Sequence, residues 1–277
     1  MSLSIREHKF LWGQRTYLMG ILNVTPDSFS DGGQFNDLQA AIAQAQYMID
    51  NGADIIDIGG QSTRPGAEQI SVTEEFNRVI PIIKAIRQQF SIPISVDTTR
   101  ATIAQDAIAA GADLINDISG GTFDPEMFTV AAKLDVPIIL MHIRGTPQTM
   151  QQMTDYQDLV TDIINALRHQ IQNAIACGVP ESKIIIDPGI GFAKTAEQNI
   201  ELLRRLSEFN TLKVPILVGT SRKSFIGKII NQPEPQKRVW GTAATCCSAI
   251  MSGADILRIH DVAEIYDVSR VTDAIYR

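Results

Sequence analysis

The sequence predicts an α/β fold, a single (β/α)8 TIM barrel over residues 1–277 with an N-terminal β-hairpin. Short Ile- and Val-rich runs, typical of strands buried in a parallel sheet, alternate with segments of helical spacing along the whole chain. The tripeptide Gly-Ala-Asp precedes three of these runs, at 52–54, 111–113 and 253–255, which indicates one reused junction. No linker divides the chain, as expected for one barrel. An open doubly wound sheet is the alternative, but no GxGxxG motif follows the first expected strand.

The expected elements follow from local patterns, taken from the N-terminus. Residues 10–12 and 16–22 flank Gly13–Arg15 and predict a hairpin whose second arm continues as the first barrel strand. Seven further buried strands are expected at 55–58, 94–96, 114–115, 136–141, 184–186, 215–218 and 256–257. Helices lie between them, with capping signals at Ser71/Glu74, Thr195/Gln198 and Asp261/Glu264. The connections 24–36 and 59–70 are polar and long, so they are expected to be functional loops.

Charge and composition exclude several classes of protein. A net charge of −7 argues against a general nucleic-acid binder, although a local basic site for a small anion is compatible with it. No apolar run is long enough to span a bilayer and the first residues contain no hydrophobic signal region. We therefore expect a cytoplasmic protein with neither nucleic-acid nor membrane partners. The three cysteines show no metal-ligand spacing.

Polar side chains follow most of the expected strands. In a barrel the carboxyl ends of all strands open on one face, so these side chains should converge there. The set comprises Asn23, Asp97, Asn116, Met141, Asp187, Lys223, Arg258, His260 and the loop 59–66. Any one of them alone could cap a helix or be a satisfied core residue, but the combination predicts a site. Carboxylate and amide oxygens suit a flat heterocycle with amidine-like N–H groups, whereas Arg64, Arg258 and His260 suit phosphate oxygens.

Eight segments of the chain carry a family resemblance. They are NVTPDSFSDGG, DIGGQSTRPGA, ISVDTTR, INDISGG, MHIRGTPQTMQ, IDPGIGFAKT, VGTSRKSFIG and RIHDV. Together they resemble the dihydropteroate synthases of bacterial folate biosynthesis, pterin-binding TIM-barrel transferases, from about Tyr17 to about Ala263. The resemblance implies that 7,8-dihydropterin-6-ylmethyl diphosphate and 4-aminobenzoate are condensed with release of pyrophosphate. It also implies a homodimer that acts on small-molecule substrates.

The resemblance implies roles for individual residues. Substrate-binding residues would be Thr63, Pro65, Asp97, Asn116, Met141, Asp187, Phe192, Ser221, Lys223, Arg258 and His260, and catalytic residues Asn23, Arg64, Lys223, Arg258 and His260. Asp97, Asn116, Asp187 and Lys223 would hold the pterin. Asn23 would bind Mg²⁺ on the diphosphate, which Arg258, His260, Thr63 and Arg64 would also meet. Ser221 would face the benzoate carboxylate, and Phe192 and Pro65 would flank its ring.

The mechanism expected from these residues is a dissociative, Mg²⁺-assisted substitution, because no strand end offers a covalent nucleophile while several groups can stabilise a departing oxyanion. Gln61 stands where the family commonly has Glu, and we expect an amide of the same shape to serve if this side chain only orients the loop. Two alternatives stay open: a pterin-binding methyltransferase that acts on methyltetrahydrofolate, and a catalytically silent pterin-binding protein.

Overall fold

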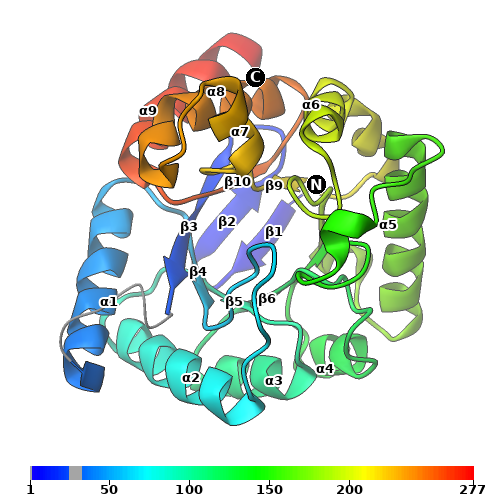
Figure 1. The fold of residues 1–277 in the computed structure, drawn as a ribbon. Coiled ribbons are helices and arrows are strands. Elements are labelled where there is room, and N and C mark those ends of the chain that lie inside the picture. Colours follow the sequence, from blue (N-terminus) through cyan, green and yellow to red (C-terminus); the bar gives the residue numbers. More distant parts are fainter. Residues whose placement is uncertain (1, 25–32) are drawn as a thin grey trace.

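The computed structural model describes residues 2–24 and 33–277, with side chains omitted for 33–37. Its main sheet contains eight parallel strands in the spatial order β8-β7-β6-β5-β4-β3-β10-β9. These are β3 (Tyr17–Asn23), β4 (Ile55–Gly59), β5 (Ile94–Asp97), β6 (Leu114–Asp117), β7 (Ile138–Met141), β8 (Ile184–Asp187), β9 (Leu217–Val218) and β10 (Ile256–Ile259). A bridge between Ile186 and Ile216 joins the two edge strands, and the N–H of Ile186 donates to Pro215 O at 3.0 Å. The predicted barrel is therefore confirmed (Figure 1).

Helices surround the strands on the outside (Figure 1). They are α1 (Gly33–Asp50), α2 (Val72–Gln89), α3 (Ala101–Ala110), α4 (Met127–Leu134), α5 (Leu159–Ala176), α6 (Ala196–Arg204), α7 (Ser224–Ile229), α8 (Val239–Met251) and α9 (Val262–Tyr276). Their apolar faces pack on the outward-facing strand residues in the larger hydrophobic core. Within the described ranges, no helix is long and apolar enough to cross a membrane.

Two of the three expected helix caps are present. Ser71 accepts the N–H of Glu74 at the start of α2, and Thr195 forms a reciprocal capping box with Gln198 at the start of α6. The third prediction was wrong, because the side chain of Asp261 makes no capping hydrogen bond to α9. Its carboxylate binds the guanidinium of Arg222 instead.

The N-terminal hairpin is present, but its strands differ from the prediction. It consists of β1 (Ser2–Ile5) and β2 (His8–Leu11), paired antiparallel, with Arg6 in the left-handed region at φ 54°. The expected second arm, 16–22, instead lies in the barrel as β3, parallel to β4 and β10. The apolar residues of the hairpin alternate with polar ones and give it one apolar face, which the strand ends of the barrel cover.

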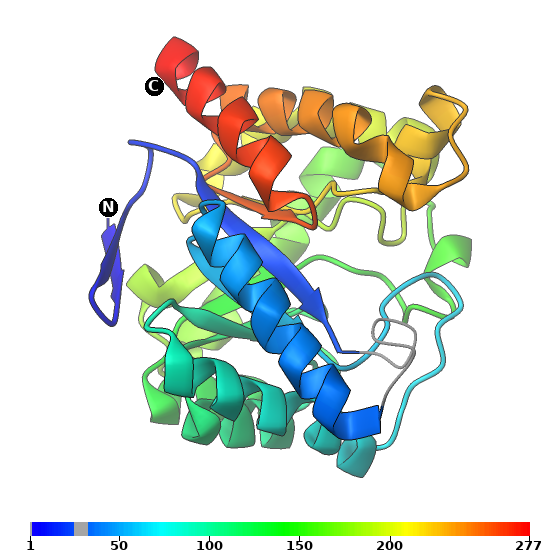
Figure 2. The same ribbon diagram turned by 90° about the vertical axis from the view of Figure 1, so that its left-hand side faces the viewer.

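That apolar face closes the amino end of the barrel. Leu3, Ile5 and Phe10 pack against the first inward-facing layer of strand residues. This layer contains Tyr17, Met19, Ile55, Leu114, Ile139, Ile185, Leu217 and Ile256. Figure 2 shows the hairpin at one end of the barrel and the loop after β4 at the other. The site must therefore open at the carboxyl end.

The inside of the barrel changes from apolar to polar along each strand. Successive strand side chains point to opposite faces, so a residue two positions after an inward apolar residue also points inward. Six such steps run Ile55 to Asp57, Ser95 to Asp97, Leu114 to Asn116, Ile139 to Met141, Ile185 to Asp187 and Ile256 to Arg258. The period of two thus raises a layer of mostly polar side chains directly above an apolar layer.

Candidate active site

A hydrogen-bonded network of charged residues forms the floor of the site. The Nε of Arg258 lies 2.6 Å from Oδ2 of Asp57, and its Nη2 lies 2.6 Å from Oδ2 of Asp97. Asn116 donates from Nδ2 to the same oxygen of Asp57 at 3.0 Å. Side chains from β4, β5, β6 and β10 are thereby fixed against one another before any ligand binds.

The network is buried, and this shifts its acid–base behaviour. Removal from water raises the pKa of Asp97, and the nearby carboxylate of Asp57 adds to this, although Arg258 acts in the opposite direction. Burial disfavours the charge of Arg258, but Asp57 and Asp97 outweigh it and raise the pKa of its guanidinium. Arg258 is therefore a permanent cation at the centre of the floor.

Asp57 belongs to this network and was missed by sequence reasoning, which considered only residues at strand ends. It lies inside β4 and is fully buried. Its Oδ1 has no hydrogen-bond partner within the described part of the chain. The available signal was a single carboxylate inside the apolar run IIDIG, two positions from the inward-facing Ile55.

Asp187 ends β8 and is held by the turn that follows. Its Oδ1 accepts the backbone N–H of Gly189 at 2.7 Å. Gly189 has φ 74°, and a Cβ atom there would lie 2.0 Å from the carbonyl oxygen of His142, so no other residue fits this turn. Burial raises the pKa of Asp187, while the Gly189 hydrogen bond and the positive charge of Lys223 lower it.

Lys223 faces the same side of the barrel from the turn before α7. Its Nζ lies 4.2 Å from the ring centroid of Phe192, a cation–π contact. Burial lowers the pKa of Lys223 to about 8, and the charge of Arg258 contributes to this. Phe192 packs with Met141 and Ile118 in a small apolar cluster. Lys223 thus combines a cation with an adjoining apolar wall.

A second buried lysine supports the turn that carries Asp187. Lys194 is 3% exposed and donates to the carbonyl oxygens of Gly189 at 3.0 Å and Phe192 at 2.9 Å. Its Nζ lies 3.2 Å from Nδ1 of His142. Sequence reasoning missed Lys194, because nothing local distinguishes it from a solvated lysine before a helix.

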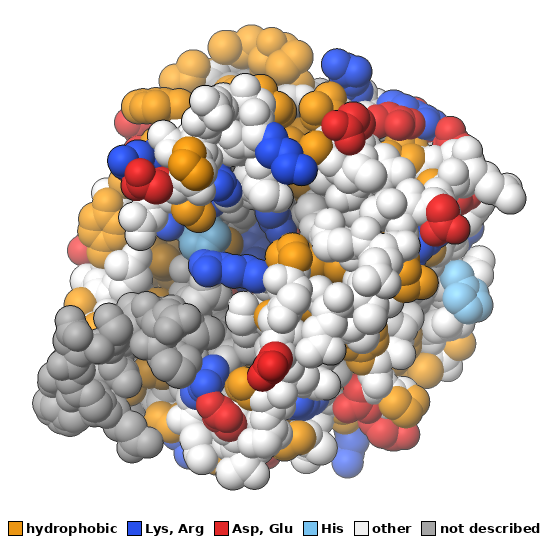
Figure 3. All heavy atoms as spheres, in the orientation of Figure 1, with side chains coloured by type: hydrophobic (Ala, Val, Ile, Leu, Met, Phe, Trp, Pro, Cys, Tyr) orange, Lys and Arg blue, Asp and Glu red, His pale blue; other side chains and the backbone are white. Residues whose placement is uncertain are grey.

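His260 and the residues around it form a cationic rim. Burial lowers the pKa of His260 to about 3, and the charges of Arg222, Arg258, Lys223 and Arg64 act in the same direction. The imidazole is therefore neutral in the physiological range. The hydroxyl of Ser221 lies 2.9 Å from its Nδ1. Figure 3 shows Lys and Arg side chains and a histidine around a hollow at this end of the barrel.

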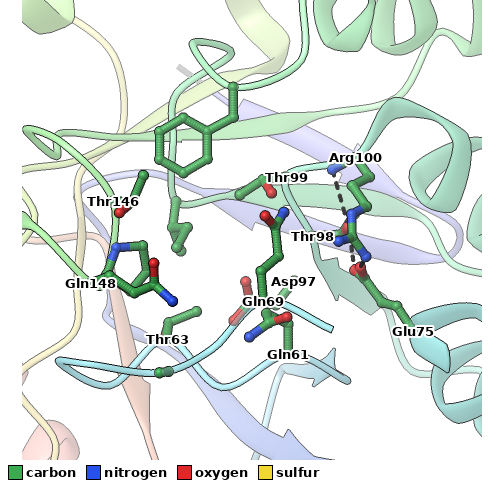
Figure 4. A pocket seen from close by; sticks show the side chains of 14 residues that line it. Gln61, Thr63, Gln69, Glu75, Asp97, Thr98, Thr99, Arg100, Thr146 and Gln148 are labelled. Carbon is green, nitrogen blue, oxygen red and sulfur yellow. Dashed lines mark hydrogen bonds and ion pairs between the residues drawn. The ribbon is translucent and has the colours of Figure 1, made fainter. Parts of the chain in front are cut away.

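The loop after β4 borders a cavity of about 320 Å³. Thr63 and Asp97 both line it, together with residues that follow β5, β6 and β7 (Figure 4). Arg64 and Pro65 are exposed on the same loop, and Pro65 is not part of this lining. Asn23 ends β3 half-buried, with its neighbour Val24 bonded to Gly59 O at 2.8 Å. Residues 25–32 of the expected functional loop lie outside the described residues.

The comparisons with known proteins agree with this geometry. A family model described as pterin binding enzyme matches residues 19–260. The dihydropteroate synthase of Synechocystis sp. is 61% identical over 275 residues, which cover 99% of this chain and 95% of that protein. The chain belongs to the dihydropteroate synthase family of pterin-binding enzymes.

Two solved dihydropteroate synthases extend the match to three dimensions. The enzyme from Clostridium difficile, crystallised in the presence of pteroic acid, has a TM-score of 0.92 at 50% identity, covering 97% of this chain and 99% of that chain. The enzyme from Xanthomonas albilineans with 4-aminobenzoic acid has a TM-score of 0.89 at 41% identity, covering 94% and 93%. Membership of the dihydropteroate synthase family also makes the chain a transferase.

For a dihydropteroate synthase, the residues predicted from sequence fall into three groups. Asp97, Asn116, Asp187 and Arg258 meet at the floor, Lys223, Phe192 and Met141 lie on one wall, and His260 and Ser221 lie at the rim. Thr63, Arg64 and Pro65 lie on the loop after β4, and Asn23 ends β3. The roles that the resemblance assigns to them remain predictions.

Proposed function

We propose that this protein condenses 7,8-dihydropterin-6-ylmethyl diphosphate with 4-aminobenzoate to give 7,8-dihydropteroate and pyrophosphate. The observation that carries the proposal is the layering of the site. Buried acceptors, Asp97, Asn116 and Asp187, lie on the floor, and the cations Arg64 and Lys223 lie near the opening. A flat polar ring suits the floor and an anionic tail suits the rim.

The floor would bind the pterin through its hydrogen-bonding edge. A carboxylate such as Asp187 can accept two parallel N–H bonds from the 2-amino group and N3 of the ring, because one of its oxygens is already oriented by Gly189. Lys223 would donate to ring O4 and N5. Arg258, fixed by Asp57 and Asp97, would offer its planar face to the ring.

The rim would stabilise the departing diphosphate. The C–O bond at the methylene breaks with its electron pair on the diphosphate, and the amine nitrogen then forms the C–N bond and loses a proton to solvent. Arg64, the N–H of His260 and Lys223 supply positive potential where negative charge develops. No described residue at the site needs to act as a covalent nucleophile. The dihydropterin itself can delocalise a cation at the methylene, so bond breaking precedes bond making.

Asn23 would provide a protein ligand for Mg²⁺. The described residues contain no group of three or more His, Cys, Asp or Glu side chains arranged for a metal. Mg²⁺ commonly keeps several waters and binds to proteins through one or two oxygen ligands together with substrate phosphates, so a single amide oxygen at the rim fits this mode. When bound, the ion neutralises charge on the diphosphate. Asn23 would orient it from the end of β3.

Phe192 and Pro65 would flank the ring of 4-aminobenzoate, since Phe192 already forms an apolar wall beside Lys223. The contribution of Ser221 is indirect in this proposal, because its hydroxyl is engaged by His260. Ser221 would therefore shape the rim rather than bind the benzoate carboxylate directly.

The protein would act as a cytoplasmic homodimer. Large apolar side chains are exposed on α8 and α9, including Trp240 at 73% and Ile275 at 66%. Met251, Val271 and Tyr276 on these two helices are also more than half exposed. Such a patch on two adjacent helices supports an interface with a second copy. Sedimentation at micromolar concentration tests this, and a monomer there would contradict it.

Product identification separates the proposed function from its rivals. We expect mass spectrometry to find dihydropteroate after incubation with both substrates and Mg²⁺. Methyl transfer from methyltetrahydrofolate to a corrinoid would favour the methyltransferase instead. Calorimetry that shows pterin binding, with no product under any condition, would favour a silent binding protein.

A further inference from the structure

The loop between β4 and α2 is tied to its own base by the side chain of Gln61. The amide Nε2 donates to the carbonyl oxygens of Ser62 and Glu68, both at 2.8 Å. The amide Oε1 accepts the backbone N–H of Ile70 at 2.8 Å. One side chain at the start of the loop therefore binds the backbone at its end and closes residues 61–70 into a ring.

This pattern of partners requires an amide. Two carbonyl oxygens need two donors, and one N–H needs an acceptor, which a glutamine side chain supplies in a single orientation. An ionised glutamate has only acceptors, so two of the three contacts would become repulsive. A protonated glutamate restores one donor. The chemistry of position 61 thus decides whether the ring closes.

The ring presents the loop residues to the anion side of the site. Within it, the N–H of Ala67 donates to Arg64 O at 3.0 Å, which fixes the turn that carries Arg64. The tip is fixed separately, since the N–H of Gly66 donates to Pro147 O at 3.0 Å. Arg64 lies near enough to His260 to lower its pKa. Opening the base of the ring would move this cation relative to His260.

We propose that Gln61 is a positioning residue whose amide holds the loop 61–70 so that Thr63 and Arg64 face the diphosphate end of the substrate. This inference rests on the proposed function for the identity of that substrate. It explains the glutamine in this chain as a working part of the loop rather than as a neutral replacement. It also reverses our expectation that Gln61→Glu would leave turnover nearly unchanged.

The charges around Gln61 determine how a glutamate there would titrate. The guanidinium of Arg78 donates to Gly60 O at 2.9 Å and pairs with Glu74, and Arg100 pairs with Glu75 at 2.6 Å. These cations are already neutralised. Asp97 and Glu75 line the same cavity as Gln61, and Glu68 follows on the loop (Figure 4). An introduced carboxylate would face carbonyl oxygens and like charges, so its pKa would lie above the usual value.

The test compares Gln61→Glu with Gln69→Glu as functions of pH. Gln69 lies on the same loop and lines the same cavity, but its side chain has no hydrogen-bond partner among the described residues, so it is a matched control for the added charge. The readouts are kcat/KM for the pterin diphosphate and, by calorimetry, the Kd of 6-hydroxymethylpterin, which lacks the diphosphate.

We expect kcat/KM of Gln61→Glu to fall by at least about tenfold at roughly pH 8 and to recover most of this loss near pH 5.5, relative to the unmodified protein at each pH. Binding of 6-hydroxymethylpterin should change less than about threefold, because the floor of the site is intact. Gln69→Glu should show neither effect. Gln61→Met, which cannot titrate, should lose activity without any recovery at low pH.

Two results would overturn the inference. One is equal behaviour of Gln61→Glu and Gln69→Glu at every pH. The other is a parallel loss of 6-hydroxymethylpterin binding in Gln61→Glu, which would mean general damage to the barrel mouth. If the unmodified protein itself made no dihydropteroate, the proposed function would fail first. The Kd of inorganic pyrophosphate, measured on the same four proteins, would then still test Gln61.

Discussion

The hydroxyl oxygen of Ser221 lies 2.9 Å from Nδ1 of His260 and accepts the backbone N–H of the same histidine at 3.1 Å. Ser221 is buried, so its single proton must also find an acceptor. Donation to Nδ1 satisfies both groups. It leaves the proton of the neutral imidazole on Nε2, the nitrogen that is free to meet an oxyanion.

Ser221→Ala should therefore change the tautomer of His260. We expect ¹⁵N NMR of the unmodified protein to show a protonated Nε2 at this histidine, assigned by loss of the signal in His260→Gln. The alanine variant should show a mixture of tautomers and a kcat/KM reduced by about 1 kcal/mol of transition-state stabilisation. Ser221→Thr, which keeps the hydroxyl, is the control. An Nδ1-protonated signal in the unmodified protein would contradict this assignment.

Asp187→Asn should weaken pterin binding by more than about 2 kcal/mol, because an NH₂ group replaces an acceptor oxygen and sets donor against donor in a buried site. Isothermal titration calorimetry with a pterin ligand measures the effect. Asp106→Asn, the same exchange on the exposed side of α3, is the control and should bind normally. A folded Asp187→Asn protein that binds within a few-fold of the original would disprove the role assigned to this carboxylate.

Lys194 should make the free energy of unfolding depend on pH. Burial lowers its pKa to about 7 from the usual 10.5, so the native state releases a proton that the unfolded chain keeps. Between these values the unfolded state binds more protons, and stability from this group rises with pH, being lost as pH falls through about 7. The unfolding free energy of the unmodified protein relative to Lys194→Met should thus increase by roughly 1–2 kcal/mol from about pH 7 to about pH 9.

Urea unfolding at both pH values measures the Lys194 effect. Lys228→Met removes an exposed lysine from α7 and should show no such dependence. A constant difference between the unmodified protein and Lys194→Met across this range would mean that Lys194 keeps its proton in the native state.

The order of bond breaking and bond making can be measured at the reacting methylene. Secondary deuterium substitution there should give a clearly normal isotope effect where chemistry limits turnover, because the carbon becomes more nearly planar as diphosphate leaves. The physical reason is the cationic rim of Arg64, Lys223 and neutral His260, which stabilises the departing group. An effect near unity or inverse would indicate that the amine is already bonding in the transition state.

The parts of the fold predicted from the sequence are those that depend on local pattern. Runs such as Ile184–Ile186 predict buried parallel strands, and barrel geometry then brings Asp97, Asn116 and Asp187 to one end without further information. The hairpin pairing was wrong because 16–22 is as apolar as a hairpin arm would be. Only the parallel partners β4 and β10 distinguish the two uses of that segment.

The residues that sequence reasoning missed act through partners distant in the chain. Asp57 matters because Arg258, 201 positions later, reaches it, and Asp261 binds Arg222 rather than capping its own helix. Lys194 is buried because β7 brings His142 over it. None of these contacts leaves a local pattern, so periodicity and capping rules could not reveal them.

The most direct test of the account is the release of pyrophosphate from the pterin diphosphate, measured with and without 4-aminobenzoate in the presence of Mg²⁺. We expect release to be fast only when 4-aminobenzoate is present and to equal the dihydropteroate formed, mole for mole. Release that is absent, or that proceeds at the same rate without 4-aminobenzoate, would contradict the proposed condensation at this end of the barrel.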